Sequence, residues 1–401
     1  RPVIQLQEAR AHILDRCPAP VAARVGLDGA RGLVTAEPIT AIGDVPPFDN
    51  TAMDGFAVRS VDTVGPPVEL VVVGTLPAGV PPEVGVGPGE AVRIMTGAVM
   101  PPGADSVVMV ERTTASDDGA TVTVEVEVGP GNHVRSAGED LRAGDEVFPP
   151  GTVLEPGHIG VLASIGRMEV PVFGRPTVGV ISTGDELVDG PVVLAPGQIR
   201  DANRHALLSL LEELGVVAVD LGLVPDVEGA IEEVLLAGVA TCDAVLTSGG
   251  VSMGDFDYVK VVLDRIGEMQ WMQVAVKPAK PLAFGLVDGV PVFGLPGNPV
   301  SSMVSFELFA RPALRAMMGH SDLDRPRVEA VVDGGLTRRP DGRVHFARVM
   351  VSHRQGLYRV SSSGGQGSHQ LSAMAAADGL AVLPDGDGPA DGDTVEVLLL
   401  R

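Results

Sequence analysis

Residues 177–318 alternate between short apolar runs and helical patterns, and this alternation constrains the fold more than any other feature. Strand-like runs lie at 177–182, 216–221, 243–247 and 272–276. Between the first two, Leu207, Leu210, Leu211 and Leu214 follow the spacing of one helix face. Helical patterns also start at Asp226 and Asp257, and a hairpin-like pair (282–286 and 292–293) precedes a helix at 299–318. Because parallel strands need crossover helices, the pattern predicts a doubly wound, mostly parallel sheet.

One stretch inside this unit, Asp243–Lys260, resembles an anion site. The run Ala244–Thr247 is a buried-strand pattern, and Ser248-Gly249-Gly250 ends it in a turn that a ligand can approach closely. A strand, a glycine turn and a helix start together direct backbone N–H groups at an anion. An ordinary tight turn is the alternative interpretation.

The placement of lysine favours the anion site. The chain uses Arg almost throughout, yet its three lysines, Lys260, Lys277 and Lys280, fall in one stretch that begins at this turn. Lysine is a compact point charge that suits phosphate or an oxyanion. We therefore expect the three ammonium groups to gather at one site.

Three strand ends carry glycine-containing polar turns, at 182–186, 248–250 and 294–299. Ligands of doubly wound sheets bind at the carboxyl ends of the strands. We expect the three turns to share one cleft, although each could also be a simple connecting loop.

The flanking regions differ in texture. Residues 4–15 predict an amphipathic helix, which we expect to pack with a second helix at 156–164. Short Val- and Thr-rich runs fill the region between them, and further strand patterns follow residue 326. The predicted fold class is multidomain α/β plus β. Its domains are a linking domain (1–42 and 141–173), an inserted β-rich domain (43–140), an α/β domain (174–326) and a C-terminal β-barrel-like domain (327–401).

The net charge of −23 argues against nucleic acid and against anionic membrane surfaces as partners. No apolar run approaches the length of a membrane span. The two cysteines, Cys17 and Cys242, are far apart and favour free thiols in the cytoplasm. For an anionic ligand, a divalent cation would offset the overall charge.

Several carboxylates could hold such a cation. A polar loop at 46–56 contains Asp54, and Asp140, Glu186 and Asp257 lie in other polar turns. Carboxylate oxygens are hard ligands suited to Mg²⁺ and can orient water. Each of them alone could equally be a surface carboxylate.

Six motifs occur in an order that resembles the molybdopterin molybdenumtransferases, the family that includes the E domain of gephyrin. They are Asp-Asn-Thr-Ala-Met-Asp-Gly (49–55), Arg-Ile-Met-Thr-Gly (93–97), Ser-Thr-Gly-Asp-Glu-Leu (182–187), Ser-Gly-Gly-Val-Ser (248–252), Lys-Pro-Ala-Lys-Pro (277–281) and Gly-Leu-Pro-Gly-Asn-Pro (294–299). The resemblance covers nearly the whole chain.

The resemblance implies an enzyme that inserts molybdate into adenylylated molybdopterin, releases AMP and requires Mg²⁺. It implies a homodimer of four-domain chains, with the active cleft between the α/β domain of one subunit and the β insertion of the other. It also implies a molybdopterin adenylyltransferase that supplies the substrate. A molybdopterin adenylyltransferase activity and a non-catalytic, gephyrin-like scaffold are the alternatives.

The resemblance also implies roles for individual residues. Gln273 departs from the pattern, because some members have Lys there, and this puts a catalytic role of that position in doubt. Glu186 and Asp257 are the expected Mg²⁺ ligands. The expected catalytic residues are Asp54, Thr96, Asp140, Glu186, Asp226, Asp257, Lys277 and Lys280. The expected substrate-binding residues are Ser248, Gly249, Gly250, Ser252, Pro296, Gly297, Asn298, Pro299, Arg348 and Ser368.

Overall fold

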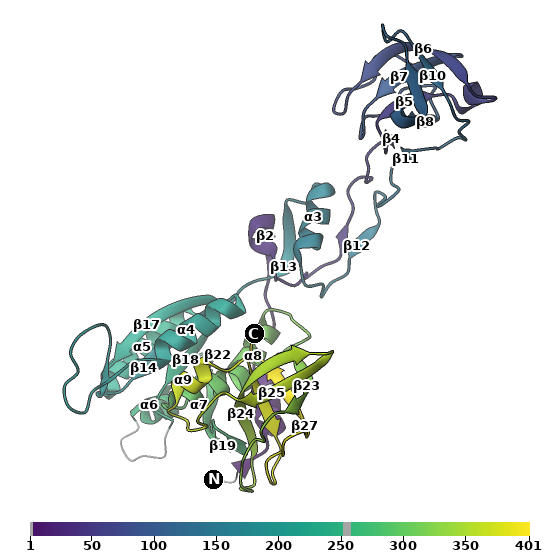
Figure 1. The fold of residues 1–401 in the computed structure, drawn as a ribbon. Coiled ribbons are helices and arrows are strands. Elements are labelled where there is room, and N and C mark those ends of the chain that lie inside the picture. The colour runs from purple at the N-terminus through teal and green to yellow at the C-terminus, as the bar shows by residue number, and fades with distance from the viewer. Residues whose placement is uncertain (1–2, 252–257) are drawn as a thin grey trace. The chain divides into compact units, whose positions relative to one another are not determined.

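The computed structural model describes residues 3–251 and 258–401, which form two compact units (Figure 1). The first unit comprises residues up to 23, residues 32–36 and residues 172–401, and the second comprises residues 24–31 and 37–171. The chain first leaves the first unit within β2 (Ala22–Gly26) and last returns to it within β13 (Glu169–Phe173), and these two strands are paired. None of the helices in the described part of the chain is long and apolar enough to cross a membrane.

A seven-stranded sheet forms the centre of the first unit. The β1–β19, β22–β18, β18–β14 and β14–β17 pairings are parallel, whereas β19–β21 and β21–β22 are antiparallel. The sheet is therefore mostly parallel, with the predicted hairpin inside it. Its strands, in spatial order, are β1 (Val3–Ile4), β19 (Glu268–Val274), β21 (Pro281–Val287), β22 (Val290–Leu295), β18 (Ala244–Ser248), β14 (Thr177–Thr183) and β17 (Val217–Val224).

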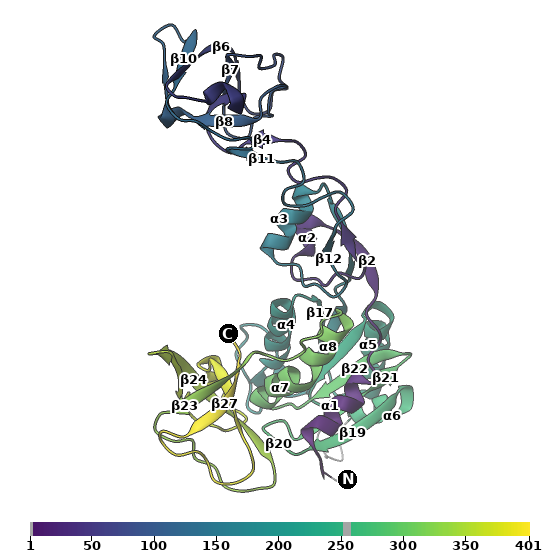
Figure 2. The ribbon, with the colours of Figure 1, turned by 90° about the vertical axis from the view of Figure 1, so that its right-hand side faces the viewer.

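Helices cover both faces of this sheet (Figure 2). Two helices, α5 and α6, pack together and bury their apolar faces against Ile181, Val245 and Val292. On the other face, α4 contacts α7, and its predicted stripe buries Leu207 and Leu211. The helices of this unit are α1 (Leu6–Leu14), α4 (Asn203–Leu214), α5 (Glu228–Thr241), α6 (Tyr258–Ile266), α7 (Pro299–Ser305), the π-helix η3 (Phe306–Ala310), α8 (Arg311–Met317) and α9 (Leu371–Ala375).

The C-terminal region forms a closed five-stranded barrel, as predicted. The order β24-β25-β23-β27-β26 closes because β24 also pairs with β26. Val332, Val349 and Val397 are fully buried in its core. A short strand from the α/β region, β20 (Val276–Lys277), adds to β24 in parallel. The barrel strands are β23 (Arg327–Val332), β24 (Val344–Arg354), β25 (Leu357–Ser362), β26 (Gly379–Leu383) and β27 (Thr394–Leu399).

The second unit is built on a six-stranded sheet with the order β8-β5-β7-β6-β10-β9. Phe56, Leu70 and Val108 are buried in one of its apolar clusters. The strands are β5 (Gly55–Val58), β6 (Val68–Leu76), β7 (Glu90–Ile94), β8 (Ser106–Met109), β9 (Thr113–Ala115) and β10 (Thr121–Val124). The smaller elements are β3 (Ile39–Thr40) paired with β12 (Glu146–Phe148), β4 (Asn50–Thr51) paired with β11 (Val134–Arg135), the helices α2 (Leu27–Ala30) and α3 (Pro156–Ser164), and the 3₁₀ turns η1 (Ser60–Thr63) and η2 (Val110–Arg112).

The N-terminal helix does not pack as expected. We predicted that it would pair with the helix at 156–164, but α1 contacts α8 and β19, and α3 contacts α2. The reason lies in its buried face, where Ala9 and Ile13 are almost inaccessible. In addition, Arg10 forms an ion pair with Asp324, just before the barrel.

Candidate functional site

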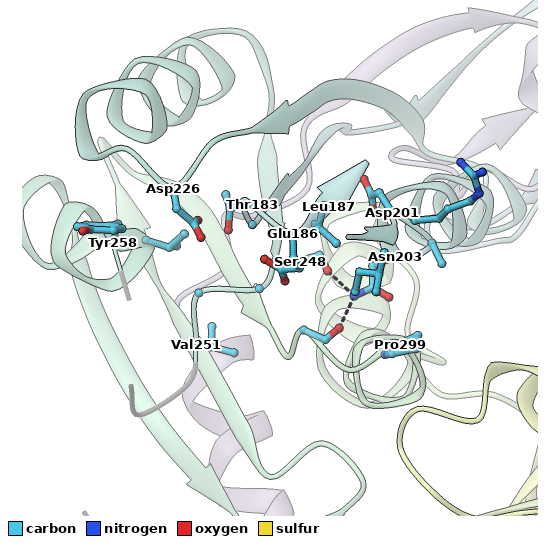
Figure 3. A pocket seen from close by; sticks show the side chains of 18 residues that line it. Thr183, Glu186, Leu187, Asp201, Asn203, Asp226, Ser248, Val251, Tyr258 and Pro299 are labelled. Atoms are coloured by element: carbon cyan, nitrogen blue, oxygen red, sulfur yellow. Dashed lines mark hydrogen bonds between the residues drawn. The ribbon is translucent and has the colours of Figure 1, made fainter. Parts of the chain in front are cut away.

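A pocket of about 410 Å³ lies where β14 and β18 end, and we call it the strand-end pocket (Figure 3). Parts of all three predicted turns line it, so the sequence-based expectation of one shared cleft is met here. Its lining includes Thr183, Gly184, Glu186, Asp201, Asn203, Asp226, Ser248, Gly249, Gly250, Tyr258, Gly297 and Pro299.

The Ser248–Gly250 turn needs its glycines. Gly249 and Gly250 have φ values of 98° and 70°, in the region that side chains rarely adopt. A Cβ atom on Gly250 would lie 2.3 Å from the Cβ of Val259, so α6 packs directly against the bare backbone. The Gly249 N–H donates to the carbonyl of Leu295 at 3.1 Å, which joins this turn to the turn after β22.

The start of α4 supplies polar groups that the sequence analysis missed. Asn203 Nδ2 donates to Ser248 Oγ at 2.8 Å and to the Gly297 carbonyl at 2.7 Å. The neighbouring Arg204 is 3% exposed and bonds to three carboxylates, those of Asp189, Asp201 and Asp220. The signal that could have located them is the polar run from Asp201 to Arg204, just before the leucine pattern of the predicted helix.

Carboxylates also line the strand-end pocket. Glu186 and Asp226 both line it, and the Asp226 N–H donates to Asp185 Oδ1 at 3.0 Å. Burial raises the pKa of the Asp226 carboxyl, and the charges of Asp185 and Glu186 raise it further against the opposing effect of a backbone hydrogen bond from Asp185.

This crowding of negative charge fits a divalent cation. Mg²⁺ is commonly held by one or two protein carboxylates together with water and substrate phosphate, and Glu186 and Asp226 meet that need. Among residues 3–251 and 258–401, no group of three or more His, Cys, Asp or Glu side chains is placed to hold a metal ion, so water and substrate would have to supply the other ligands. Two predicted residues, Asp257 and Ser252, lie outside the described residues.

A second pocket of about 570 Å³, which we call the lysine pocket, lies between the α/β sheet and the barrel. Lys277 and Lys280 line it from the strand β20 and the turn that follows, and Ser301, Gln366 and Ser368 line it from α7 and from the loop after β25. Both lysine side chains are exposed, and neither forms an ion pair with a carboxylate among the described residues.

The expectation that all three lysines gather was wrong for one of them. Lys260 lies on α6 with its ammonium group 5.7 Å from the centre of the Trp271 ring. The side chain thus lies on the side of α6 that faces β19. Lys260 lines neither the strand-end pocket nor the lysine pocket.

The turn after β22 lies between the two pockets. Gly297 and Pro299 line the strand-end pocket, whereas Ser301, two residues further on, lines the lysine pocket. The predicted residues Pro296 and Asn298 lie in the same turn, and Asn298 is the residue from which α7 begins. The two pockets are therefore neighbours across the first turn of α7.

Arg348 is fully buried, with an exposed fraction of 0%. One of its guanidinium nitrogens donates to the carbonyls of Gly365 at 2.6 Å and Gly367 at 3.2 Å. Gln366 also binds the Arg348 backbone. In this structure Arg348 thus supports the loop that presents Ser368 to the lysine pocket. Its side chain has no exposed surface through which it could make the direct contact with a ligand that we had predicted.

The predicted residues of the β insertion lie in the second unit. Asp54 Oδ1 accepts hydrogen bonds from the Thr96 N–H at 2.7 Å and from Thr96 Oγ1 at 2.8 Å. These bonds lower the pKa of the Asp54 carboxyl. Asp140 lies in a neighbouring loop, where its N–H donates to the Val45 carbonyl at 2.9 Å. The structure thus brings into contact two residues that the family resemblance implied separately as catalytic.

Comparisons with known proteins cover the whole chain. Three family descriptions match in order, "MoeA N-terminal region (domain I and II)" over residues 4–166, "Probable molybdopterin binding domain" over 179–316 and "MoeA C-terminal region (domain IV)" over 336–400. A molybdopterin molybdenumtransferase of Haemophilus influenzae is 38% identical over 98% of both chains. A molybdopterin molybdenumtransferase 2 of Mycobacterium tuberculosis is also 38% identical, over 99% of this chain and 97% of the relative.

A solved structure agrees with these matches. The crystal structure of the molybdopterin biosynthesis MoeA protein from Pyrococcus horikoshii superimposes with a TM-score of 0.83 at 31% identity and covers 100% of both chains. Sequence and fold are thus shared along the full length. The chain belongs to the molybdopterin molybdenumtransferase family.

Proposed function

We propose that this chain is a molybdopterin molybdenumtransferase, which inserts molybdate into adenylylated molybdopterin and releases AMP. The observation that carries the proposal is the pair of neighbouring pockets. One is lined by glycine turns and carboxylates, and the other by two lysines that form no ion pair with the carboxylates of the described residues. A nucleotide-linked pterin and a small oxyanion are two ligands that need two such sites side by side.

The strand-end pocket takes the adenylylated pterin in this proposal. Gly249 and Gly250 carry no side chain, so phosphate oxygens can approach the main chain of this turn closely, although the Gly249 N–H itself is bonded to the Leu295 carbonyl. Glu186 and Asp226 would hold Mg²⁺, which when bound offsets phosphate charge and favours loss of the AMP group.

The lysine pocket takes molybdate. The chain carries a net charge of −23, so a dianion needs local cations that are not already neutralised. Lys277 and Lys280 meet that need, and the hydroxyl groups of Ser301 and Ser368 add hydrogen-bond donors. Most of the rate gain would come from holding the oxyanion beside the dithiolene sulfurs.

The Asp54–Thr96 pair belongs to the other compact unit, and we propose that it completes the site from a second copy of the chain in a homodimer. The two Thr96 hydrogen bonds keep the Asp54 carboxylate ionised and fix its direction. Asp54→Ala is expected to abolish AMP release while the dimer stays folded. Wild-type turnover of that variant would remove Asp54 from the catalytic residues.

A molybdopterin adenylyltransferase would supply the substrate. We also propose that the protein works in the cytoplasm, a reducing compartment in which free thiols such as Cys17 and Cys242 are common.

The deciding experiment is molybdate-dependent release of AMP from adenylylated molybdopterin by the purified chain. ATP-dependent adenylylation of molybdopterin without this activity would indicate the adenylyltransferase alternative. Neither activity would indicate a scaffold. A scaffold needs no lysine pocket. An adenylyltransferase alone needs neither the β insertion nor the barrel that lines the lysine pocket. The architecture therefore favours the molybdenumtransferase.

A further inference from the structure

In the strand-end pocket, the Asn203 side chain bonds to two of the glycine turns at once (Figure 3). Its amide nitrogen donates to Ser248 Oγ at 2.8 Å in the turn after β18, and to the Gly297 carbonyl at 2.7 Å in the turn after β22.

The chemistry of these partners fixes which way the amide faces. The Gly297 carbonyl only accepts hydrogen bonds, so the nitrogen of Asn203, and not its oxygen, must face it. The second hydrogen of the same nitrogen then points to Ser248 Oγ, which accepts it. Since the Ser248 hydroxyl accepts from Asn203, its own proton is free to be donated to another group.

The base of this arrangement is rigid. Asn203 is the first residue of α4, and the next residue, Arg204, is clamped by the carboxylates of Asp189, Asp201 and Asp220. Asp201 also accepts a hydrogen bond from Ser182 at 3.0 Å, which ties the start of the helix to the end of β14. The amide of Asn203 is therefore held in place from behind.

We propose that Asn203 is a positioning residue that joins two of the turns and commits the Ser248 hydroxyl to donating its proton to the bound substrate. This inference rests on the proposed function and deepens it. The acceptor would be an anionic oxygen of the adenylylated substrate, because Ser248 lines the strand-end pocket beside two glycines, and an anionic oxygen is a strong acceptor for a hydroxyl proton. Asn203 itself need not touch the substrate.

Asn203→Asp is the sharpest test, because it keeps the shape and reverses the polarity. A carboxylate at position 203 accepts the Ser248 proton, so the hydroxyl can no longer donate it to a ligand. We expect Asn203→Asp to weaken AMP binding about tenfold, equivalent to about 1.4 kcal/mol. Asn203→Ala leaves Ser248 free to rotate and should weaken binding only about threefold.

A double-mutant cycle separates this effect from simple charge repulsion. If Asn203→Asp acts by capturing the Ser248 proton, Ser248→Ala should weaken AMP binding by a similar factor, and the double variant should be no weaker than Asn203→Asp alone. Isothermal titration with AMP measures each corner of the cycle. Ser209→Ala, an exposed position on the same helix, is the control and should bind AMP like the wild type.

Steady-state kinetics supply a second readout. The KM for adenylylated molybdopterin should rise in Asn203→Asp, while the molybdate concentration for half-maximal rate stays constant. Additive losses in the cycle, or wild-type AMP affinity in Asn203→Asp, would overturn the inference. If the wild-type chain shows no molybdate-dependent AMP release, the proposed function is refuted instead. The failure of the inference about Asn203 and the failure of the proposed function are therefore distinguishable.

Discussion

Gly250→Ala tests whether the strand-end pocket depends on bare backbone. Two separate costs act at this position. With φ at 70°, any residue with a Cβ atom pays about 1 to 2 kcal/mol to stay in the left-handed region. The added Cβ would also lie 2.3 Å from Val259, whose side chain is 1% exposed in the core between the sheet and α6.

The steric cost can be separated by a matched glycine. A contact of 2.3 Å between two Cβ atoms cannot persist, so the turn or α6 must move, at the about 1 to 3 kcal/mol typical of overpacking. Gly289 in the β21–β22 turn has φ of 82° and no atom within 4 Å of its would-be Cβ, so Gly289→Ala carries the backbone cost alone. We expect a total loss of about 2 to 5 kcal/mol for Gly250→Ala and about 1 to 2 kcal/mol for Gly289→Ala.

Urea unfolding measures the two stabilities, and titration with AMP measures the pocket. Gly250→Ala should lose AMP binding even where it remains folded, because the displaced turn no longer holds Ser248 and the glycine backbone at the pocket wall. Gly289→Ala, at the far end of the hairpin, should bind AMP normally. If the two variants were equally stable and both bound AMP, the close packing of α6 against this turn would not matter to the site.

Three further predictions concern charge. Burial lowers the pKa of the His320 imidazole to about 4, so between about pH 6.5 and 4 the unfolded chain binds the extra proton first. The free energy of unfolding should therefore fall by about 3 kcal/mol as the pH falls through this range, and His320→Gln should abolish this pH dependence. Urea midpoints that vary with pH in the same way in both proteins would contradict this. Lys280→Ala should raise the half-saturating molybdate concentration about tenfold, a factor worth about 1.4 kcal/mol, whereas Lys260→Ala should leave it unchanged. Asp226→Asn should raise the Mg²⁺ needed for half-maximal AMP release, also about tenfold, and an unaltered Mg²⁺ titration would exclude a role in holding the metal.

Much of the architecture follows from local patterns. The strand predicted at 177–182 is found at Thr177–Thr183, and the helix predicted at 156–164 is found at those residues. Such elements are readable because their apolar period and their Gly and Pro boundaries lie within a few residues of each other. The turn of the predicted hairpin is also local, because Asp288-Gly289 is a dipeptide that favours the positive φ values found at both residues.

Contacts between distant segments were not readable in this way. Arg204 is neutralised by Asp189 and Asp220, which lie 15 and 16 positions away, and no local pattern links them. The packing of α1 against α8 and the separation of Lys260 from the other lysines also depend on tertiary placement. The sequence therefore pointed to many of the pocket residues, but only the structure shows that they belong to two separate pockets.

The short strand β20 belongs to both halves of the first unit. The preceding strand β19 pairs within the large sheet as far as Val274, which pairs with Ile4. Val276 and Lys277 then pair with Val344 and His345 of the barrel. The Ala275 N–H also donates to Ile4 and its carbonyl accepts from Val344. Truncation of the chain near residue 326 would therefore remove the pairing partner of β20, and the truncated protein would lose one wall of the lysine pocket. On heating, the sheet and the barrel should melt in a single cooperative transition.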